Sequence, residues 1–426
     1  MRVEITRLPN GLTVATDPMP QLESASLGVW VNCGARHETE ARMGISHMLE
    51  HMAFKDTERR TARVIAEEIE AVGGALNAYT SREQTAFHAR VLKADVPLAA
   101  DILADILTHP TFDAGELERE RQVVLQEIGQ AHDTPDDIIF DHLQTAVYPD
   151  QPMGWPILGN EKTVNAFTRE QLDEYLRVNY RGGGTTLIAS GAVDHATMLE
   201  LAERHFGALL FGEAPGSVPA QFVGSDIRHK EDLEQVHVAY AFPGVPSGDD
   251  TLFAAQVFVT ALGGGMSSRL FQEIREKRGL CYSIYAFANS FLDGGMIGVY
   301  AGTGQNEAAD ISGLVVDQIA LLAHTANAEE VARAKAQLRS GFLMGLERPS
   351  ARAEQIAAHL FAYGRVLSID EIKQKLDAVT VGAVRHFGER VMATHRPAIA
   401  ALGPVGKLES YESFARRFSP PAHAAE

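Results

Sequence analysis

The stretch Ser46-His47-Met48-Leu49-Glu50-His51-Met52-Ala53 has helical character and carries two histidines four residues apart. Four residues make about one helical turn, so both imidazoles lie on one helix face, where a single metal ion can meet both. Two histidines and a carboxylate are typical of zinc, with a fourth position left for water. Glu50 follows His47 by three residues and adjoins His51, so we expect it to take a proton from that water.

Two ordinary helix histidines beside a surface glutamate would give the same pattern. A third metal ligand elsewhere in the sequence is needed to distinguish a zinc site from this simpler reading. Glu120 and Glu127 are seven residues apart on a charged, periodic stretch that starts after Asp113. This spacing is about two turns along one helix face. Glu127 lies just beyond the apolar run Val123–Leu125, which favours it as the residue that points inward. Taken alone, glutamates at this spacing more often form a solvated stripe.

Length and composition limit the class of protein. The chain has 426 residues, 45% of them hydrophobic and 22% charged, which is typical of a soluble globular protein with two or three domains. Its net charge of −18 argues against nucleic acid as a partner, because phosphate binding needs a basic surface. The same charge permits a basic peptide substrate, although an acidic surface that keeps the protein soluble is the simpler reading.

The cysteines and the first residues bear on the compartment. Cys33 and Cys281 are far apart in apolar contexts and do not form a disulfide framework, which favours a reducing environment. The start Met1-Arg2-Val3-Glu4 leads into strand-like sequence without a signal or transit pattern, and no transmembrane run is visible. We therefore expect a cytoplasmic protein without a membrane partner.

The pattern along the chain predicts an α+β fold with two similar halves. An Asn10-Gly11 turn predicts a hairpin, and a Gly/Pro/Ser-rich stretch after Phe211 predicts a linker. Strand runs followed by helix runs recur after this linker and favour mainly antiparallel sheets covered by helices. We expect a catalytic domain at 1–211, a linker at 212–230 and a domain of homologous fold at 231–426. The main expected elements are helices at about 42–54 and 60–72, and strands at 76–79, 85–92, 236–240, 282–288 and 295–301.

Together, these residues resemble the pitrilysin and mitochondrial-processing-peptidase family of inverted-motif zinc peptidases, in particular its short members. The family carries H-x-x-E-H and a glutamate ligand 76 residues after the second histidine, which is the separation of His51 and Glu127. The resemblance implies one Zn²⁺ per chain, held by His47, His51 and Glu127, with Glu50 as the catalytic base. The family also has an acidic residue seven before the ligand. Glu120 fills that place and is expected to support the site from the outer shell.

Two further segments resemble substrate-binding parts of the family. The stretch Gly73–Ser81 is similar to its edge strand, along which the peptide adds as a further strand, and this implies contacts from Asn77, Ala78 and Thr80. Without the zinc motif, an ordinary hairpin would be preferred. Arg275 and Tyr282 match an arginine and a tyrosine seven apart that reach the scissile carbonyl, where they can stabilise an oxyanion.

Specificity rests on weaker matches. Asp137 and Asp141 are four residues apart and can form a carboxylate pair for an arginine guanidinium. The processing peptidases use acidic residues at these places, with glutamate usual at the first. Phe54 resembles the aromatic wall of the pocket on the leaving side. Asp56 replaces the glycine of the family's F-K-G-T sequence, and this change is expected to alter the turn.

The resemblance implies a zinc endopeptidase with a preference for basic residues, whose two halves form a clam-shell chamber around the peptide. Short members of the family pair, so we expect a homodimer or a heterodimer with a motif-lacking homologue. The alternative is a non-catalytic structural or assembly subunit, as some relatives have lost the motif. The complete set of ligands, base and Arg/Tyr pair favours catalysis. A purely structural zinc site is disfavoured because three protein ligands leave one position open.

Overall fold

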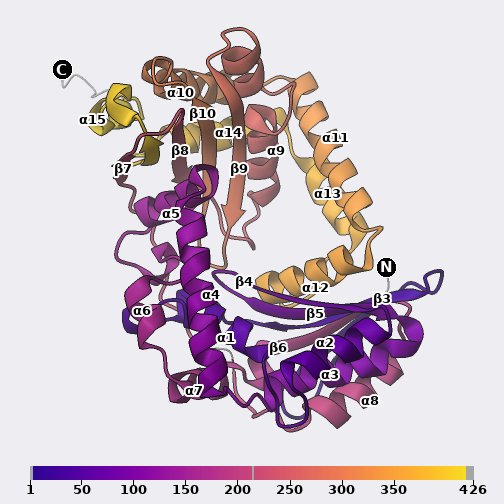
Figure 1. Cartoon of the computed structure of the whole chain (residues 1–426). Coiled ribbons are helices and arrows are strands. Elements are labelled where there is room, and N and C mark those ends of the chain that lie inside the picture. The colour runs from indigo at the N-terminus through magenta and orange to yellow at the C-terminus, as the bar shows by residue number, and fades with distance from the viewer. Residues whose placement is uncertain (1–2, 214, 419–426) are drawn as a thin grey trace. The chain divides into compact units, whose positions relative to one another are not determined.

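The computed structural model describes residues 3–213 and 215–418. Met1, Arg2, Ala214 of the expected linker and residues 419–426 lie outside the described residues. The chain divides into two compact units. The first comprises residues 1–130, 155–218 and 344–367, and the second comprises residues 131–154, 219–343 and 368–426. Each unit contains one sheet covered by helices (Figure 1).

The sheet of the first unit has six strands in the order β1-β2-β6-β3-β5-β4. Strands β2 and β6 pair in parallel, the other neighbours are antiparallel, and β4 lies at an edge. The bounds are β1 Glu4–Arg7, β2 Thr13–Pro18, β3 Ser24–Val31, β4 Ala75–Thr80, β5 Thr85–Leu92 and β6 Thr185–Gly191.

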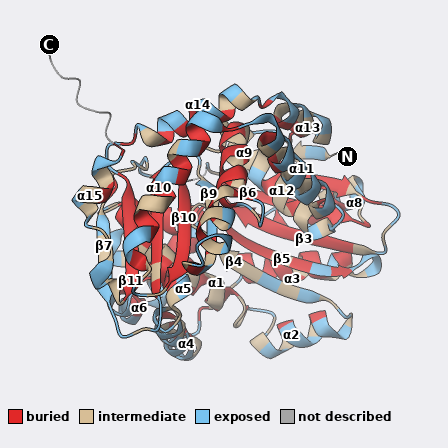
Figure 2. Ribbon diagram, turned by 90° about the horizontal axis from the view of Figure 1, so that it is seen from above, coloured by how far each residue is buried: buried red, intermediate tan, exposed pale blue. Residues whose placement is uncertain are grey.

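Both faces of this sheet are covered. Side chains of β3 such as Val29 pack with Met48 of helix α1 and with residues of α3 and α8 in one core. On the opposite face, Trp30 packs with Ile356 of helix α12. A strand buried on both faces needs apolar residues at nearly every position. This explains why β3 is an almost continuous buried run rather than an alternating one (Figure 2).

The second unit repeats this arrangement with five strands in the order β7-β11-β8-β10-β9. Helices α9, α10 and α14 cover one face of the sheet and α5 covers the other. Strand β9 lies at an edge and pairs with β10 alone. The bounds are β7 Asp226–Lys230, β8 Val236–Pro243, β9 Cys281–Ser290, β10 Gly295–Thr303 and β11 Ala398–Gly403.

The helices connect and cover these sheets. Their bounds are α1 Ile45–Ala53, α2 Ala62–Ala71, α3 Val96–Thr108, α4 Ala114–His132, α5 Pro135–Val147, α6 Glu161–Ala166, α7 Arg169–Asn179, α8 His195–Phe206, α9 Leu252–Gly263, α10 Ala308–Thr325, α11 Ala328–Gly345, α12 Pro349–Tyr363, α13 Ile369–Ala378, α14 Val381–Met392 and α15 Tyr411–Arg416. Among the described residues, none of these helices combines the length and the apolar character needed to cross a membrane.

The expected α+β class with two similar halves is confirmed, while two details of the domain boundaries differ. Residues 226–230 of the expected linker form β7, because they pair in parallel with β11. In addition, the units exchange segments. Helix α5 from the first half of the sequence packs on the second sheet, and α12 from the second half packs on the first sheet. The units therefore do not coincide with residues 1–211 and 231–426.

Candidate metal centre

Helix α1 presents the motif because its two faces differ in burial. Ile45, Met48, Leu49 and Met52 are buried in the core of the first unit, which turns the intervening histidines and Glu50 to the opposite side. The helix starts after Gly44, which has a φ of 89°. A side chain at Gly44 would be strained in this left-handed conformation and would also meet the backbone of Gly159.

The structure brings His47, His51 and Glu127 together. The two imidazole centroids are 4.6 Å apart. Oε2 of Glu127, on α4, lies 3.7 Å from Nε2 of His47 and 3.5 Å from Nε2 of His51. One ligand atom from each residue lies within 4.8 Å of the other two. Three donors that converge in this way fit a zinc ion with one open position.

Unsatisfied polar atoms support this fit. Oε2 of Glu127 is buried, and within the described part of the chain it has no hydrogen-bond partner. A buried carboxylate oxygen without a hydrogen-bond partner is costly, and a cation bound between this oxygen and the two imidazole nitrogens would satisfy it. The pKa of His47 is lowered to about 3, first by burial and then by the charge of His51. His47 is thus a neutral imidazole at ordinary pH, the form that binds metals.

Glu120, the acidic residue expected in the outer shell, contacts His51. Its Oε2 lies 3.0 Å from Nδ1 of His51, and its Oε1 lies 2.5 Å from Nζ of Lys55. With the proton assigned to Nδ1, His51 donates to Glu120 and its Nε2 stays free for the metal. Lys55 is a contribution that the sequence did not reveal. With a divalent ion bound, the three carboxylates of Glu50, Glu120 and Glu127 would leave one net negative charge, which the ammonium group of Lys55 would balance.

Lys55→Met is expected to weaken zinc binding by about tenfold, at the lower end of the effect of residues that orient a metal ligand. Methionine keeps a long side chain but removes the charge that holds Glu120, so the carboxylate loses its fixed position beside His51. Competition with a chromophoric chelator measures the affinity, and Lys162→Met, at an exposed position of α6, serves as the matched control. Equal affinities for the two variants would show that Glu120 does not depend on Lys55.

Glu50 is held by a residue expected to bind substrate. The hydroxyl of Thr80 donates to Oε2 of Glu50 at 2.6 Å, so the structure places Thr80 on the candidate base. The pKa of Glu50 is raised, chiefly by burial, while the Thr80 hydrogen bond and the charge of His51 oppose this shift and Glu127 adds to it. A carboxylate with a raised pKa is better matched to proton transfer near neutral pH.

Strand β4 is a free edge beside this site. Among the described strands it pairs with β5, and the exposed N–H of Ala78 donates to the side-chain oxygen of Asn77 at 2.8 Å. On the opposite face of the sheet, the hydroxyl of Tyr79 donates to Oε2 of Glu354 on α12 at 2.7 Å. Thr80 and Tyr79 therefore fix β4 from both faces, and its outer edge remains open for another strand.

The segment that follows α1 contains Phe54 and Asp56. The ring of Phe54 packs against the core of the first unit, 6.0 Å from the centroid of Phe87. Asp56, which departs from the family's glycine, accepts a hydrogen bond from the backbone N–H of Ala62 at the start of α2. Its own carbonyl accepts from Thr111. Asp56 thus adds a helix cap to this turn.

The remaining residues expected in the site belong to the second unit. Arg275 lies on the π-helical segment Phe271–Glu276, and its guanidinium carbon is 5.5 Å from the ring centroid of Tyr282. Tyr282 is 79% exposed, so its hydroxyl is accessible. Asp137 and Asp141 lie one turn apart on α5, exposed and half-buried respectively. The structure thus brings together the members of each pair.

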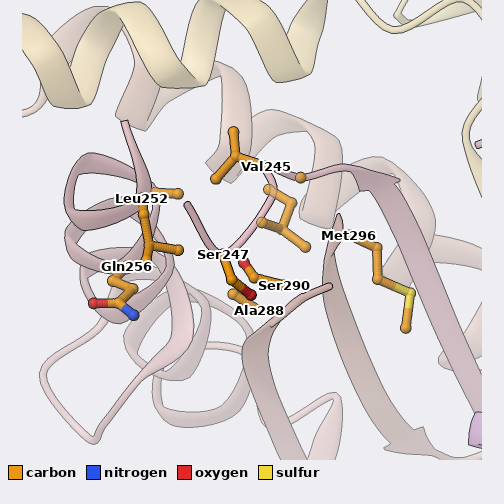
Figure 3. A pocket seen from close by; sticks show the side chains of 10 residues that line it. Val245, Ser247, Leu252, Gln256, Ala288, Ser290 and Met296 are labelled. Carbon is orange, nitrogen blue, oxygen red and sulfur yellow. The ribbon is translucent and has the colours of Figure 1, made fainter. Parts of the chain in front are cut away.

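A cavity of about 210 Å³ in the second unit is a separate feature. It is lined by Leu252 and Gln256 of α9, Ser290 of β9 and Met296 of β10, among others (Figure 3). None of the residues expected in the site lines it.

Comparison with known proteins gives the family. A family model described as Insulinase (Peptidase family M16) matches residues 13–161, and one described as Peptidase M16 inactive domain matches residues 166–338. An uncharacterised zinc protease of Rickettsia felis is 38% identical over 401 residues, which cover 94% of this chain and 97% of the relative. The chain belongs to the insulinase family. The resemblance found in the sequence is thereby confirmed.

A further relative and a solved structure are also similar to this chain. A mitochondrial-processing peptidase beta subunit of Blastocladiella emersonii is 37% identical over 420 residues, 96% of this chain and 90% of that protein. A crystal structure of a protease from Helicobacter pylori shares the fold with a TM-score of 0.87 at 21% identity, over 94% of this chain and 99% of that one. The convergent group His47, His51 and Glu127 lies within the part that matches the first family model. Family membership supports a zinc-dependent peptidase function.

Proposed function

We propose that this chain is a zinc-dependent endopeptidase that cleaves extended peptides. The observation that carries the proposal is the convergence of His47, His51 and Glu127, with Glu50 on the same helix and held by Thr80. Such a group has three protein ligands and a positioned carboxylate, which is the arrangement that hydrolytic zinc sites require.

Each residue of the proposed site has a separate role in peptide hydrolysis. Zinc, when bound, makes a water molecule more acidic and polarises the scissile carbonyl. Glu50 accepts the proton of the attacking water and returns a proton to the leaving amine. The peptide adds to the free edge of β4, where Asn77 and Ala78 contact it. In this proposal Arg275 and Tyr282 stabilise the oxyanion, and Phe54 forms one wall of the leaving-side pocket.

We further propose a preference for arginine near the cleaved bond, given by Asp137 and Asp141. Asp137→Asn with Asp141→Asn is expected to lower kcat/KM for an arginine-containing peptide about tenfold or more, since a charge-assisted pair contributes about 1.5–3 kcal/mol. A neutral peptide should lose much less. The charge-matched control is Asp232→Asn with Asp250→Asn, both exposed in the same unit. Equal losses on both peptides would remove the preference.

The partner and the compartment also belong to the proposal. We propose a cytoplasmic enzyme with one zinc ion per chain, active as a homodimer or with a homologue that lacks the motif. Purification without a partner, a mass measurement and a peptide-library digest with and without a chelator test this directly. Chelator-sensitive cleavage by a homodimer supports the enzyme. Absence of cleavage by the zinc-loaded protein, both alone and mixed with a motif-lacking homologue, would favour the alternative, a structural or assembly subunit.

A further inference from the structure

A buried carboxylate lies behind the helix that carries the metal motif. Glu38 is 5% exposed and precedes α1 by a short turn. Its Oε2 accepts the backbone N–H of Gly44 at 2.7 Å, and its Oε1 accepts the backbone N–H of Ser46 at 2.8 Å. Gly44 has no side chain to cap the helix. Glu38 therefore supplies the cap from outside the helix.

Glu38 belongs to a buried polar network that reaches three elements. The hydroxyl of Ser46 lies 2.8 Å from the hydroxyl of Tyr175 on α7, which in turn lies 3.2 Å from Sγ of Cys33, two residues after β3. All four side chains are less than 9% exposed. Burial raises the pKa of Glu38 to about 7, against the hydrogen bonds from Ser46 and Gly44 that oppose this shift. Such a network is costly to bury unless every member is satisfied.

The network lies at the start of α1, immediately before the candidate metal ligands. Ser46 is followed directly by His47, so the two hydrogen bonds to Glu38 fix the backbone immediately before the first candidate ligand. The second histidine and Glu50 lie within the next turn of the same helix. A carboxylate at a helix N-terminus is also favoured by the helix dipole. A small rotation or shift of α1 would move both imidazoles away from Glu127.

We propose that Glu38 is a positioning residue of the metal centre: by holding the first turn of α1 it sets the separation of His47 and His51 from Glu127. This inference rests on the proposed zinc site. It assigns Glu38 no contact with substrate or metal. The competing explanation is a cap that contributes stability alone, and the two differ in what they predict for metal affinity.

The test compares Glu38→Ala and Glu38→Gln with two controls. Glu40→Gln changes an exposed glutamate of the same turn, and Val14→Ala opens a cavity in the same core on β2. For each protein, zinc affinity, the absorption spectrum of the cobalt-substituted form and Tm are measured. Cobalt reports the ligand geometry independently of activity. Val14→Ala supplies a protein of lowered Tm whose metal ligands are untouched.

Glu38→Ala is expected to bind zinc about tenfold more weakly and to show an altered cobalt spectrum. Glu38→Gln, which keeps one acceptor oxygen, should lie between this variant and the wild type. The controls should keep wild-type affinity, Val14→Ala despite its lower Tm. If Glu38→Ala does not fold, the zinc affinity and cobalt spectrum of Glu38→Gln alone test the inference. If the Glu38 variants keep the zinc affinity and cobalt spectrum of the wild type and only their Tm is lowered, the inference is overturned. If the wild-type protein itself binds no zinc, the proposed metal site is overturned.

Discussion

Glu50→Gln is expected to lower kcat/KM for a basic peptide by about a thousandfold, within the range of general acid–base catalysis, while zinc stays bound. Glutamine has nearly the same shape and can still accept the hydrogen bond from Thr80 that the structure shows at 2.6 Å. It cannot accept a proton from water at neutral pH. The three ligand atoms of the metal-binding group belong to other residues, so the affinity for zinc should change little.

The measurement pairs steady-state cleavage with zinc content for the same preparation. Glu58→Gln is a matched control, because Glu58 is an exposed glutamate shortly after α1. The control should cleave at the wild-type rate and lose activity with a chelator. If Glu50→Gln retained chelator-sensitive cleavage, the base would have to be another group, and the role proposed for Thr80 would be lost with it.

The core of the candidate site could be predicted from the sequence because its residues either lie close together on one helix or are separated by a number of residues that the family fixes. His47 and His51 share a helix face by periodicity, and the 76-residue separation led to Glu127 and then to Glu120. Lys55 could not be found in this way. A lysine after α1 reads as a surface charge, and its contact with Glu120 arises only when α1 and α4 pack together.

The same limit applies to the residues that hold the site from behind. Glu38, six and eight residues before the N–H groups that it caps, follows no capping pattern within the helix itself. Thr80 was expected along the substrate strand, but its hydroxyl faces Glu50 because residues of a strand alternate between the faces of the sheet. Which face meets α1 depends on the order of the strands, which sequence alone does not show.

The fold class could be predicted, while the exchange of helices between the units could not. An apolar helix face shows that a helix is buried but not which sheet it covers. Helix α12 therefore read as part of the second half, although Arg352 and Glu354 on it bind Asp17 and Tyr79 of the first sheet. Strand β7 was hidden for a similar reason, since the polar sequence of Asp226–Lys230 resembles a linker until β11 pairs with it.

Glu127→Gln is expected to weaken zinc binding by more than the roughly 10- to 100-fold effect of outer-shell partners, and cleavage should fall with the metal. The structure gives this prediction a second, opposite consequence. Without metal, Oε2 of Glu127 is a buried carboxylate oxygen that has no hydrogen-bond partner among the described residues. Removing its charge should leave the metal-free protein as stable as the wild type or more stable.

Two melting curves, with chelator and with excess zinc, separate these effects. The wild type should gain Tm when zinc is added, because a ligand that binds only the folded state stabilises it by mass action. Glu127→Gln should start at an equal or higher Tm and gain little. Glu118→Gln, an exposed position on the same helix, should behave as the wild type. A Glu127→Gln protein that takes up one zinc ion with wild-type affinity would show that Glu127 is not a ligand, and a metal-free variant that melts well below the wild type would show that its carboxylate supports the fold instead.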